Sequence, residues 1–327
     1  MRKLITVSTN KNQAVIAIKT AFVFSGQGAQ FHGMGKELYD NFSICKDVFD
    51  EADDALSLKL STICFDEEKL NDLNRTEFCQ PAILTLSTAC FRLLSDAGFQ
   101  ADAMAGLSLG EYSALTSGGA FLFRDAVRLV RKRGQFMAEA VPEGQGAMSA
   151  ILGLSAAALE KACLDAAPFG IVVCANYNAP GQIVIAGTTA AVAEAEKYAL
   201  AAGASRAVRL QVSGAFHTEL MRPAAERLAE ALNKTPVHAL SVPVISNTDA
   251  QAIPSRDAVI PTLLKQIVSP VRWSESVENM IAAGVDTFIE LGPGKTLSSF
   301  IKKINRDVNI YNIQDIKSYE KTLNGLQ

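Results

Sequence analysis

The stretch AMAGLSLGEYSAL, residues 103–115, predicts a sharp turn from a short buried strand into a helix. Within it, Gly106 and Gly110 flank Ser108 in a G-x-S-x-G pattern. A serine at such a turn exposes its hydroxyl oxygen beside a helix N-terminus, where free N–H groups favour a developing oxyanion. Small residues are also common at any tight turn, so the pattern alone leaves Ser108 either a nucleophile or an ordinary turn serine.

The same order of strand, Gly-rich turn and helix recurs on both sides of this stretch. AFVF at 21–24 precedes the loop SGQGAQ, VPVISN at 242–247 has the character of a strand, and DTFIE at 286–290 runs into LGPGK and a helical segment. Strands alternating with helices predict an α/β fold, with a large domain that has a mostly parallel sheet and a hydrolase-like core. We expect this domain to comprise residues 21–145 and 213–327, after a short N-terminal extension of residues 1–20.

Between residues 146 and 212 the order of predicted elements changes. GAMSAILGL is strand-like, Ser155 can cap a helix through Ala167, and IVVCANYN and GQIVIAG flank NAPG as a hairpin. A helix at 189–202 and a last strand, SRAVRLQV, complete the order β-α-β-β-α-β. This is the order of a ferredoxin-like subdomain, which we expect to be inserted at 146–212, with an active site in the groove between the two units.

Composition narrows the classes of function. The chain has 327 residues, of which 49% are hydrophobic and 20% charged, and a net charge of −3 gives no basis for binding nucleic acid. Its six cysteines form no C-x-x-C pair, as is usual for reduced core cysteines of an intracellular protein. Its three histidines lack metal-ligand spacing, and AVIAI near the N-terminus is too short for a membrane span. We therefore expect a cytoplasmic monomer with no metal, bound cofactor or membrane partner.

A nucleophilic serine needs a base, and the chain offers only His32, His217 and His238. His217 follows QVSGAF and precedes a helix predicted from about Glu219 to Leu232, so it lies at an element end, where sites are often built. A helix N-terminus also disfavours imidazolium, which keeps the ring available as a base. Histidines near helix starts are often only structural, so both interpretations of His217 stay open.

Arg133 is predicted to face the core of a helix. In FRDAVRLVRKRGQFMAEA, residues 123–140, the positions three and four residues to either side of it are all apolar. An arginine on that face keeps its charge and must find an anion, either in a structural salt bridge or as a bidentate clamp on a substrate carboxylate. Arg128, Arg131 and Lys132 fall on other faces, where we expect them to be solvated.

Two Gly-rich loops follow predicted strands. SGQGAQ, residues 25–30, is not a dinucleotide motif, since Phe31 occupies the third glycine position, and no G-K-S/T follows it. One of its backbone N–H groups could instead act as an oxyanion donor. The second loop, LGPGK at 291–295, is most simply a tight turn.

Seven motifs taken together resemble one family. SGQGAQ, GLSLGEYSAL, RKRGQFM, NYNAPGQIVIAG, VSGAFHTELM, KQIVSPVRW and ELGPGKTL occur in the order and at the spacing of the malonyl-CoA:acyl carrier protein transacylases of type II fatty acid synthesis. The resemblance runs from about Thr20 to about Asn305. It implies a transfer of malonyl from malonyl-CoA to the phosphopantetheine thiol of acyl carrier protein, by ping-pong kinetics through a malonyl-serine.

The resemblance also assigns roles. It makes Ser108 the nucleophile and His217 its base, with the main-chain carbonyl of Gln266 orienting the histidine in place of an aspartate. Arg133 would pair with the free malonyl carboxylate. The remaining implied positions are the oxyanion donors Gln27 and Leu109, the cleft asparagines Asn176 and Asn178, and Phe216, which would crowd a branched α-carbon.

Two positions depart from the family pattern. Leu107 stands where many members have a histidine before the nucleophile, and Ser25 replaces the proline of F-P-G-Q-G. The first questions local packing more than activity, and the second should loosen the turn slightly.

Other interpretations stay open. A trans-acting polyketide acyltransferase shares every motif, whereas a serine esterase or thioesterase should show an acidic residue between serine and histidine and no core-facing arginine. A catalytically silent scaffold that binds carrier protein is disfavoured by the intact Ser108, His217 and Arg133. Because carrier proteins are acidic, we expect a basic rim around the cleft, with two candidate groups: Arg128, Arg131 and Lys132, and Lys302, Lys303 and Arg306.

Overall fold

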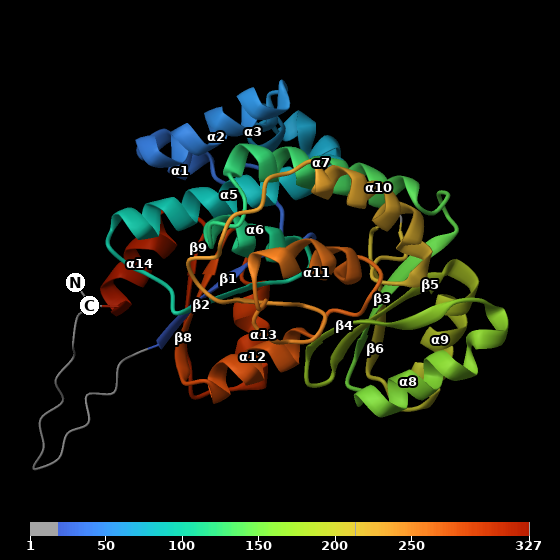
Figure 1. The fold of residues 1–327 in the computed structure, drawn as a ribbon. Coiled ribbons are helices and arrows are strands. Elements are labelled where there is room, and N and C mark those ends of the chain that lie inside the picture. Colours follow the sequence, from blue (N-terminus) through green and yellow to red (C-terminus); the bar gives the residue numbers. More distant parts are fainter. Residues whose placement is uncertain (1–18, 213, 327) are drawn as a thin grey trace, which may run out of the picture.

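The computed structural model describes residues 19–212 and 214–326, which form a large α/β unit and a smaller unit with its own sheet (Figure 1). The large sheet has five parallel strands in the order β7-β2-β1-β8-β9. This confirms the mostly parallel sheet predicted from the sequence. Its strands are β1 (Lys19–Phe24), β2 (Ala103–Gly106), β7 (Val244–Ile245), β8 (Val285–Leu291) and β9 (Asn309–Ile313).

Strand bounds differ from the expected ones most clearly at β1, at β7 and at β6 (Arg206–Arg209), which contains four of the eight residues of SRAVRLQV. β1 begins at Lys19, so it takes two residues from the predicted extension, and the rest of that extension lies outside the described residues. β7 contains only two of the six residues of VPVISN, and these pair with Met104 and Ala105 of β2.

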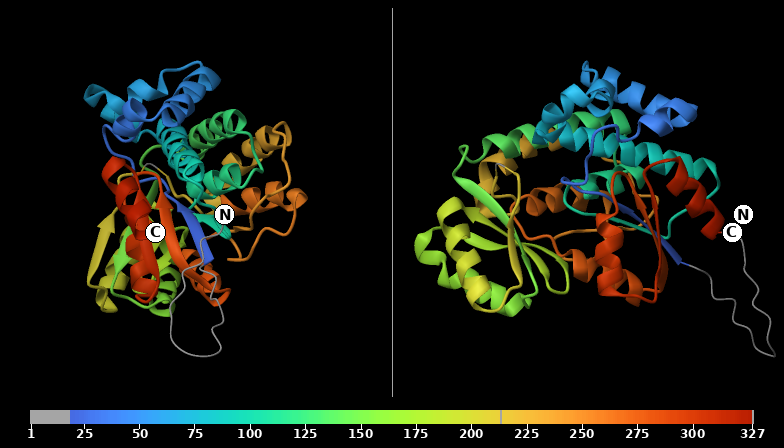
Figure 2. Two further views of the ribbon diagram at one scale, coloured as in Figure 1. Left: turned by 90° about the vertical axis from the view of Figure 1, so that its left-hand side faces the viewer. Right: turned by 180° about the vertical axis from the view of Figure 1, so that it is seen from behind.

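Side chains of β1, the central strand, point alternately to the two faces of the sheet, so the core of the large unit is divided into two clusters. Phe22 and Phe24 pack into the cluster formed with α2, α5, α6 and α7, while Ala21 and Val23 face the other cluster, where Trp273 and Leu297 lie. Figures 1 and 2 show the corresponding layers, with α5, α6 and α7 on one side of the sheet and α12 and α13 on the other. The sheet is therefore covered on both faces, as a parallel sheet requires.

Most helices belong to this large unit. Before the small unit lie α1 (Lys36–Asn41), α2 (Ser43–Leu56), α3 (Leu60–Phe65), α4 (Leu70–Asn74), α5 (Thr76–Asp96), α6 (Leu109–Ser117) and α7 (Phe123–Glu139). After it lie α10 (Arg222–Asn233), α11 (Val259–Gln266), α12 (Trp273–Ala282), α13 (Thr296–Ile304) and α14 (Ile316–Leu326). Three 3₁₀ turns complete it, η1 (Glu67–Lys69), η3 (Glu219–Met221) and η4 (Arg256–Ala258).

The small unit has the expected ferredoxin-like arrangement. Its antiparallel strands run in the order β4-β5-β3-β6 and are covered by α8 and α9. Ser155 caps α8 as predicted, since its hydroxyl accepts from the Ala158 N–H at 3.4 Å, although that helix ends at Asp165. The elements are β3 (Gly146–Leu152), α8 (Ala156–Asp165), η2 (Ala167–Phe169), β4 (Val172–Ala179), β5 (Gln182–Thr188), α9 (Thr189–Ala201) and β6 (Arg206–Arg209). The domain boundaries at 146 and 212 stay a prediction.

The two units are joined by backbone hydrogen bonds as well as by the chain. The Tyr177 N–H of β4 donates to the Val271 carbonyl at 2.9 Å, and the Val271 N–H donates to Ala175 at 2.9 Å. Val271 lies between α11 and α12, so β4 is fixed against the part of the large unit that carries Gln266.

Two properties concern the whole chain. All six cysteines are free and buried, as expected. Among the residues the structure describes, no helix is both long and apolar enough to cross a membrane.

Candidate active site

Ser108 lies on the predicted sharp turn between β2 and α6, with φ 55° and ψ −100°. This left-handed φ is rare for a non-glycine residue and costs on the order of 1–3 kcal/mol. The flanking glycines are required by close approach, since a Cβ on Gly106 would lie 2.0 Å from the Gly110 backbone and one on Gly110 would lie 2.1 Å from the Phe24 carbonyl oxygen. The G-x-S-x-G pattern therefore encodes this backbone, and the strain marks Ser108 as a candidate site residue.

His217 is hydrogen-bonded to Ser108 across the fold. Its Nε2 lies 2.8 Å from the Ser108 Oγ, and its Nδ1 lies 2.9 Å from the main-chain oxygen of Gln266. Because a carbonyl only accepts, Nδ1 carries the proton and Nε2 accepts from the serine hydroxyl. Burial, together with the charge of Arg133, lowers the pKa of His217 to about 4. The ring is therefore neutral near pH 7 and can take the serine proton.

Arg133 is buried beside the same serine. Its Nη2 donates to the Ser108 Oγ at 3.1 Å and to the Gln266 Oε1 at 3.0 Å, and its Nη1 donates to the Gln80 Oε1 at 2.9 Å. The guanidinium also lies 5.1 Å from the ring centre of Tyr112. No carboxylate of the described residues forms an ion pair with it. The structural salt bridge left open by the sequence is thus not found there, and the guanidinium can receive an anion beside Ser108.

A buried polar network lies beneath these three residues. The Asn247 Oδ1 accepts from the Ser108 N–H at 2.7 Å, and its Nδ2 donates to the Gly106 carbonyl at 2.7 Å. The Gln266 Nε2 donates to the Ser108 carbonyl at 2.8 Å and to the Glu111 Oε2 at 2.9 Å. Both amide side chains thus hold the turn on which Ser108 lies. Burial raises the pKa of Glu111 to about 7.

The loop that carries Gln27 meets Ser108 because β1 and β2 are parallel neighbours, with Phe24 paired to Gly106. The carboxyl ends of both strands therefore open at the same edge of the sheet. The Gln27 side chain donates to the Thr76 Oγ1 at 3.2 Å, and Gln80 links it at 3.4 Å to the Arg133 network. Leu109 is the first residue of α6, where backbone N–H groups lack helical partners.

A groove of about 460 Å³ opens beside this loop. Its lining is rich in amides that can both donate and accept hydrogen bonds, among them Gln27, Asn71, Asn74, Gln135 and Gln211. The Gln27 loop thus has an open polar approach on one side and the buried Arg133 network on the other.

Three further residues named from the sequence are buried and, within the residues that the structure describes, form no hydrogen bonds with the central ones. Asn176 and Asn178 are buried in β4, and the Asn178 Oδ1 has no hydrogen-bond partner among the described residues. Phe216 is buried immediately before His217. None of the three forms a hydrogen bond with Ser108, His217 or Arg133 in the described part of the chain.

Comparison with known proteins identifies the chain. Residues 21–322 match the family of the acyl transferase domain. The malonyl CoA-acyl carrier protein transacylase of Bacillus subtilis is 48% identical over 310 residues, which are 94% of this chain and 98% of that protein. The chain belongs to the acyl transferase family.

Solved structures agree with the assignment of this chain to the acyl transferase family. The malonyl CoA-acyl carrier protein transacylase from Clostridium perfringens has a TM-score of 0.91 at 46% identity and covers 94% of this chain and 97% of its own. A malonyl-transacylase in complex with a type II PKS acyl-carrier protein has a TM-score of 0.91 at 40% identity, covering 94% and 99%. The family resemblance seen in the motifs is thereby confirmed.

Sequence reasoning missed three polar residues of this acyltransferase's site. Gln80 lies in the apolar run CQPAIL of α5, Asn247 ends VPVISN, and Glu111 follows Ser108 by three residues. The only available signal was a polar residue in an apolar stretch, which does not say what the side chain contacts.

Ser25 and Leu107, the two departures from the family pattern, make different kinds of contact. The Ser25 hydroxyl donates to the Pro293 carbonyl at 2.8 Å, so the loop expected to be looser is tied to the ELGPGKTL segment. Leu107 is partly buried and packs against the β-sheet cluster that contains Trp273.

Arg128 and Lys132 are exposed, as expected, and Arg131 is partly buried, while both arginines also bind α2. The Arg128 Nε donates to the Ala55 carbonyl at 2.7 Å and the Arg131 Nη1 to the Leu56 carbonyl at 3.4 Å. The last turn of α2 thus occupies these two guanidinium groups.

Proposed function

We propose that this acyltransferase moves a malonyl group from malonyl-CoA to the phosphopantetheine thiol of acyl carrier protein, through an ester on Ser108. The observation that carries the proposal is the buried Arg133, whose Nη2 lies 3.1 Å from the Ser108 Oγ and whose hydrogen-bond acceptors are all neutral. A nucleophile adjacent to a guanidinium that has no direct ion-pair partner among the described residues suits an acyl group that ends in a carboxylate. The relatives that carry the transacylase name support the same substrates.

In the first half-reaction, His217 takes the Ser108 proton on Nε2 while the Oγ attacks the thioester carbonyl. The backbone N–H groups of Gln27 and Leu109 are the proposed donors to the oxyanion, and such a donor contributes about 3 kcal/mol. As the tetrahedral intermediate collapses, the C–S bond breaks and the proton on His217 passes to the thiolate of CoA. The products are malonyl-Ser108 and free CoA.

The second half-reaction reverses this order with a different thiol. The phosphopantetheine thiol of acyl carrier protein gives its proton to His217 and attacks the ester carbonyl. The C–O bond to Ser108 then breaks, and His217 returns the proton to the serine oxygen. The Gln266 carbonyl keeps the imidazole in the tautomer that both steps need.

Selectivity follows from the same geometry. We propose that the malonyl carboxylate binds Arg133, while an acetyl group would leave that buried charge without an anion. Asn176, Asn178 and Phe216 are proposed to line the acyl pocket, with Phe216 crowding a branched α-carbon. The Asn178 Oδ1, buried without a partner among the described residues, is free to make the polar contact proposed for bound substrate.

A role in polyketide rather than fatty acid synthesis is the second candidate, because one structural neighbour is a malonyl-transacylase bound to a type II PKS acyl-carrier protein. A serine esterase is disfavoured, since among the described residues a main-chain carbonyl, and not a carboxylate, binds the His217 Nδ1. We further propose a cytoplasmic monomer without a resident cofactor. Six buried thiols suit a reducing compartment, and the proposed steps need only groups of one chain.

The test is intact-protein mass spectrometry after brief mixing with malonyl-CoA and, separately, with acetyl-CoA. Wild type should gain one malonyl group and much less acetyl, and Ser108→Ala should gain neither. Release of CoA without an adduct would instead favour a hydrolase. Competition between fatty acid and polyketide carrier proteins for the malonyl-enzyme then separates the two pathways.

A further inference from the structure

Glu111 is a buried carboxylate that the proposed mechanism does not use. It lies in the first turn of α6, three residues after Ser108, and is fully buried. Its Oε2 accepts from the Gln266 Nε2 at 2.9 Å and from the Asn247 N–H at 3.1 Å, while its Oε1 has no hydrogen-bond partner among the described residues. Burying a carboxylate in this way is costly unless something offsets it, so its presence here needs an explanation.

Both partners of Glu111 also hold the reacting groups. Gln266 donates to the Ser108 carbonyl, accepts from Arg133 through Oε1, and accepts from His217 through its main-chain oxygen. Asn247 binds the N–H of Ser108 and the carbonyl of Gly106. One carboxylate thus contacts the two residues that together bond to Ser108, His217 and Arg133.

A glutamine amide can be flipped so that its oxygen and its NH₂ group exchange places, and Glu111 fixes which of the two orientations Gln266 adopts. The Glu111 Oε2 accepts from the Asn247 N–H as well as from Gln266, so it takes the NH₂ end of Gln266 and leaves the oxygen end facing Arg133. In the reverse orientation two donors would face each other at the guanidinium. The carboxylate also lies one amide away from Arg133, so it does not occupy the guanidinium that the substrate would need.

We propose that Glu111 is a positioning residue of the malonyl site, which fixes the amide of Gln266 and the backbone of Asn247 and thereby holds Arg133 in place beside Ser108. This inference rests on the proposed malonyl transfer and deepens it. Glu111 touches neither Ser108 Oγ nor the guanidinium, so its effect passes through its two partners.

The readout is the ratio of the labelling rate constants of Ser108 with malonyl-CoA and with acetyl-CoA. Loss of folded enzyme lowers both rates equally and leaves the ratio unchanged, whereas a displaced Arg133 lowers only the malonyl rate. Glu111→Ala should reduce the ratio about tenfold or more, as expected when a hydrogen bond to a charged group is lost. Glu111→Gln should restore a ratio close to wild type, because its amide oxygen can replace Oε2 and its NH₂ falls where Oε1 has no partner.

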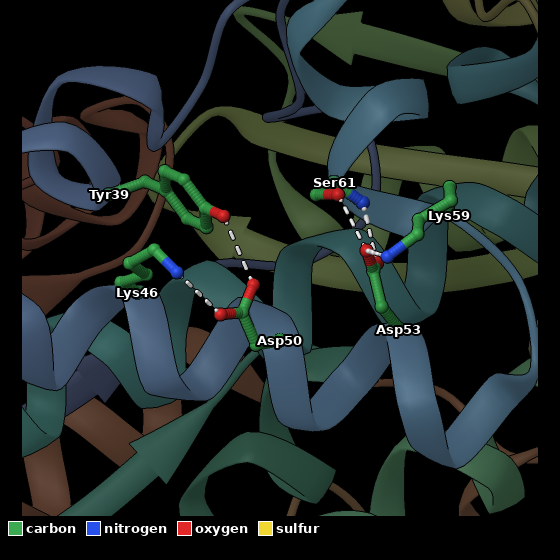
Figure 3. A network of polar contacts seen from close by, with 6 residues as sticks. All are labelled: Tyr39, Lys46, Asp50, Asp53, Lys59 and Ser61. Atoms are coloured by element: carbon green, nitrogen blue, oxygen red, sulfur yellow. Dashed lines mark hydrogen bonds and ion pairs between the residues drawn. The ribbon is translucent and has the colours of Figure 1, made fainter.

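Asp53 provides a matched control (Figure 3). It is also buried, and it accepts from the Ser61 N–H at 2.9 Å and the Ser61 hydroxyl at 2.7 Å, with Lys59 at 3.4 Å. Its carboxylate joins α2 to α3 and contacts no residue of the active site. Asp53→Ala should lower stability and leave the malonyl-to-acetyl ratio at its wild-type value.

Gln266→Leu tests the same path of hydrogen bonds from Glu111 to Arg133 while leaving Glu111 itself unchanged. It keeps the main-chain carbonyl that binds His217 and removes the amide, so it should lower the ratio as Glu111→Ala does. Suppose that wild type is labelled by malonyl-CoA in preference to acetyl-CoA but either variant keeps the wild-type ratio. The inference about Glu111 is then overturned, while the proposed function stands. A wild-type enzyme that shows no such labelling overturns the proposed function and this inference together.

Discussion

Arg133 Nη2 lies 3.1 Å from Ser108 Oγ, so a guanidinium that never loses its charge donates to the proposed nucleophile. The same Oγ lies 2.8 Å from the His217 Nε2. One oxygen therefore faces both the group that would remove its proton and the group that would bind the far end of the acyl chain. Transfer and selection of the acyl group are in this way combined within a few ångströms.

Replacing Arg133 should change which acyl group is transferred. Arg133→Ala removes the anion partner, and the free energy lost on breaking a buried ion pair is about 3–5 kcal/mol, so kcat/KM for malonyl-CoA should fall by roughly 10²–10⁴. The rate with acetyl-CoA should stay the same or rise. Steady-state assays with both donors measure this, and an equal loss with both would argue that Arg133 is only structural.

Acylation of Ser108 should not show the pH dependence expected when the base is a histidine of ordinary pKa. Burial lowers the pKa of His217 to about 4, so the ring stays neutral as pH falls through 6.5. Quench-flow labelling with malonyl-CoA should therefore show no loss of base function between pH 7 and pH 5. If the acylation rate declined near pH 6.5 in both wild type and Glu111→Gln, this would contradict the assignment of His217 as a buried, neutral base.

The sequence predicted the parts of this site that depend on local backbone. The turn at Ser108 follows from two glycines whose neighbours leave no room for a Cβ, and the burial of Arg133 follows from helical spacing in α7. The sequence did not reveal Glu111, Asn247 or Gln80, because their partners lie 53 to 155 positions away along the chain. A hydrogen bond between side chains that distant has no periodic pattern, so only the fold shows it.

The short β7 has a similar cause. VPVISN has the composition of a strand, but the chain turns after Ile245, where the Ser246 N–H donates to the Gln251 carbonyl at 2.8 Å. The remaining residues leave the sheet, and this brings Asn247 under Ser108.

Two buried groups should have opposite effects on stability between pH 7 and about pH 4.5. The pKa of His217 is lowered in the folded state, so its unfolded form binds more protons below 6.5 and stability falls with falling pH. The pKa of Glu111 is raised to about 7, so the folded form binds more protons above 4.5 and stability rises with falling pH. Each effect is about 3 kcal/mol, and they nearly cancel in wild type.

Glu111→Gln removes one of these effects and should expose the other. Its free energy of unfolding should fall, relative to wild type, by about 3 kcal/mol between pH 7 and pH 4.5. Urea denaturation at the two pH values measures the difference between the variant and wild type. Equal changes in both proteins would mean that Glu111 has no raised pKa in the folded state.

The basic surface that would receive acyl carrier protein is expected at the end of α13. Lys302 and Lys303 are exposed there, and the Lys303 Nζ donates at 2.7 Å to the Gln182 Oε1 of β5, so this surface adjoins the small unit. Arg128 and Arg131 are weaker candidates, because each donates to a carbonyl of α2. Lys302→Glu with Lys303→Glu should raise KM for the acidic carrier protein several-fold, with a stronger effect at low salt, and leave malonyl labelling of Ser108 unchanged. Lys36→Glu with Lys46→Glu, two exposed charge reversals on α1 and α2, is the matched control, and an equal effect of the two double changes on KM would mean that only net charge matters.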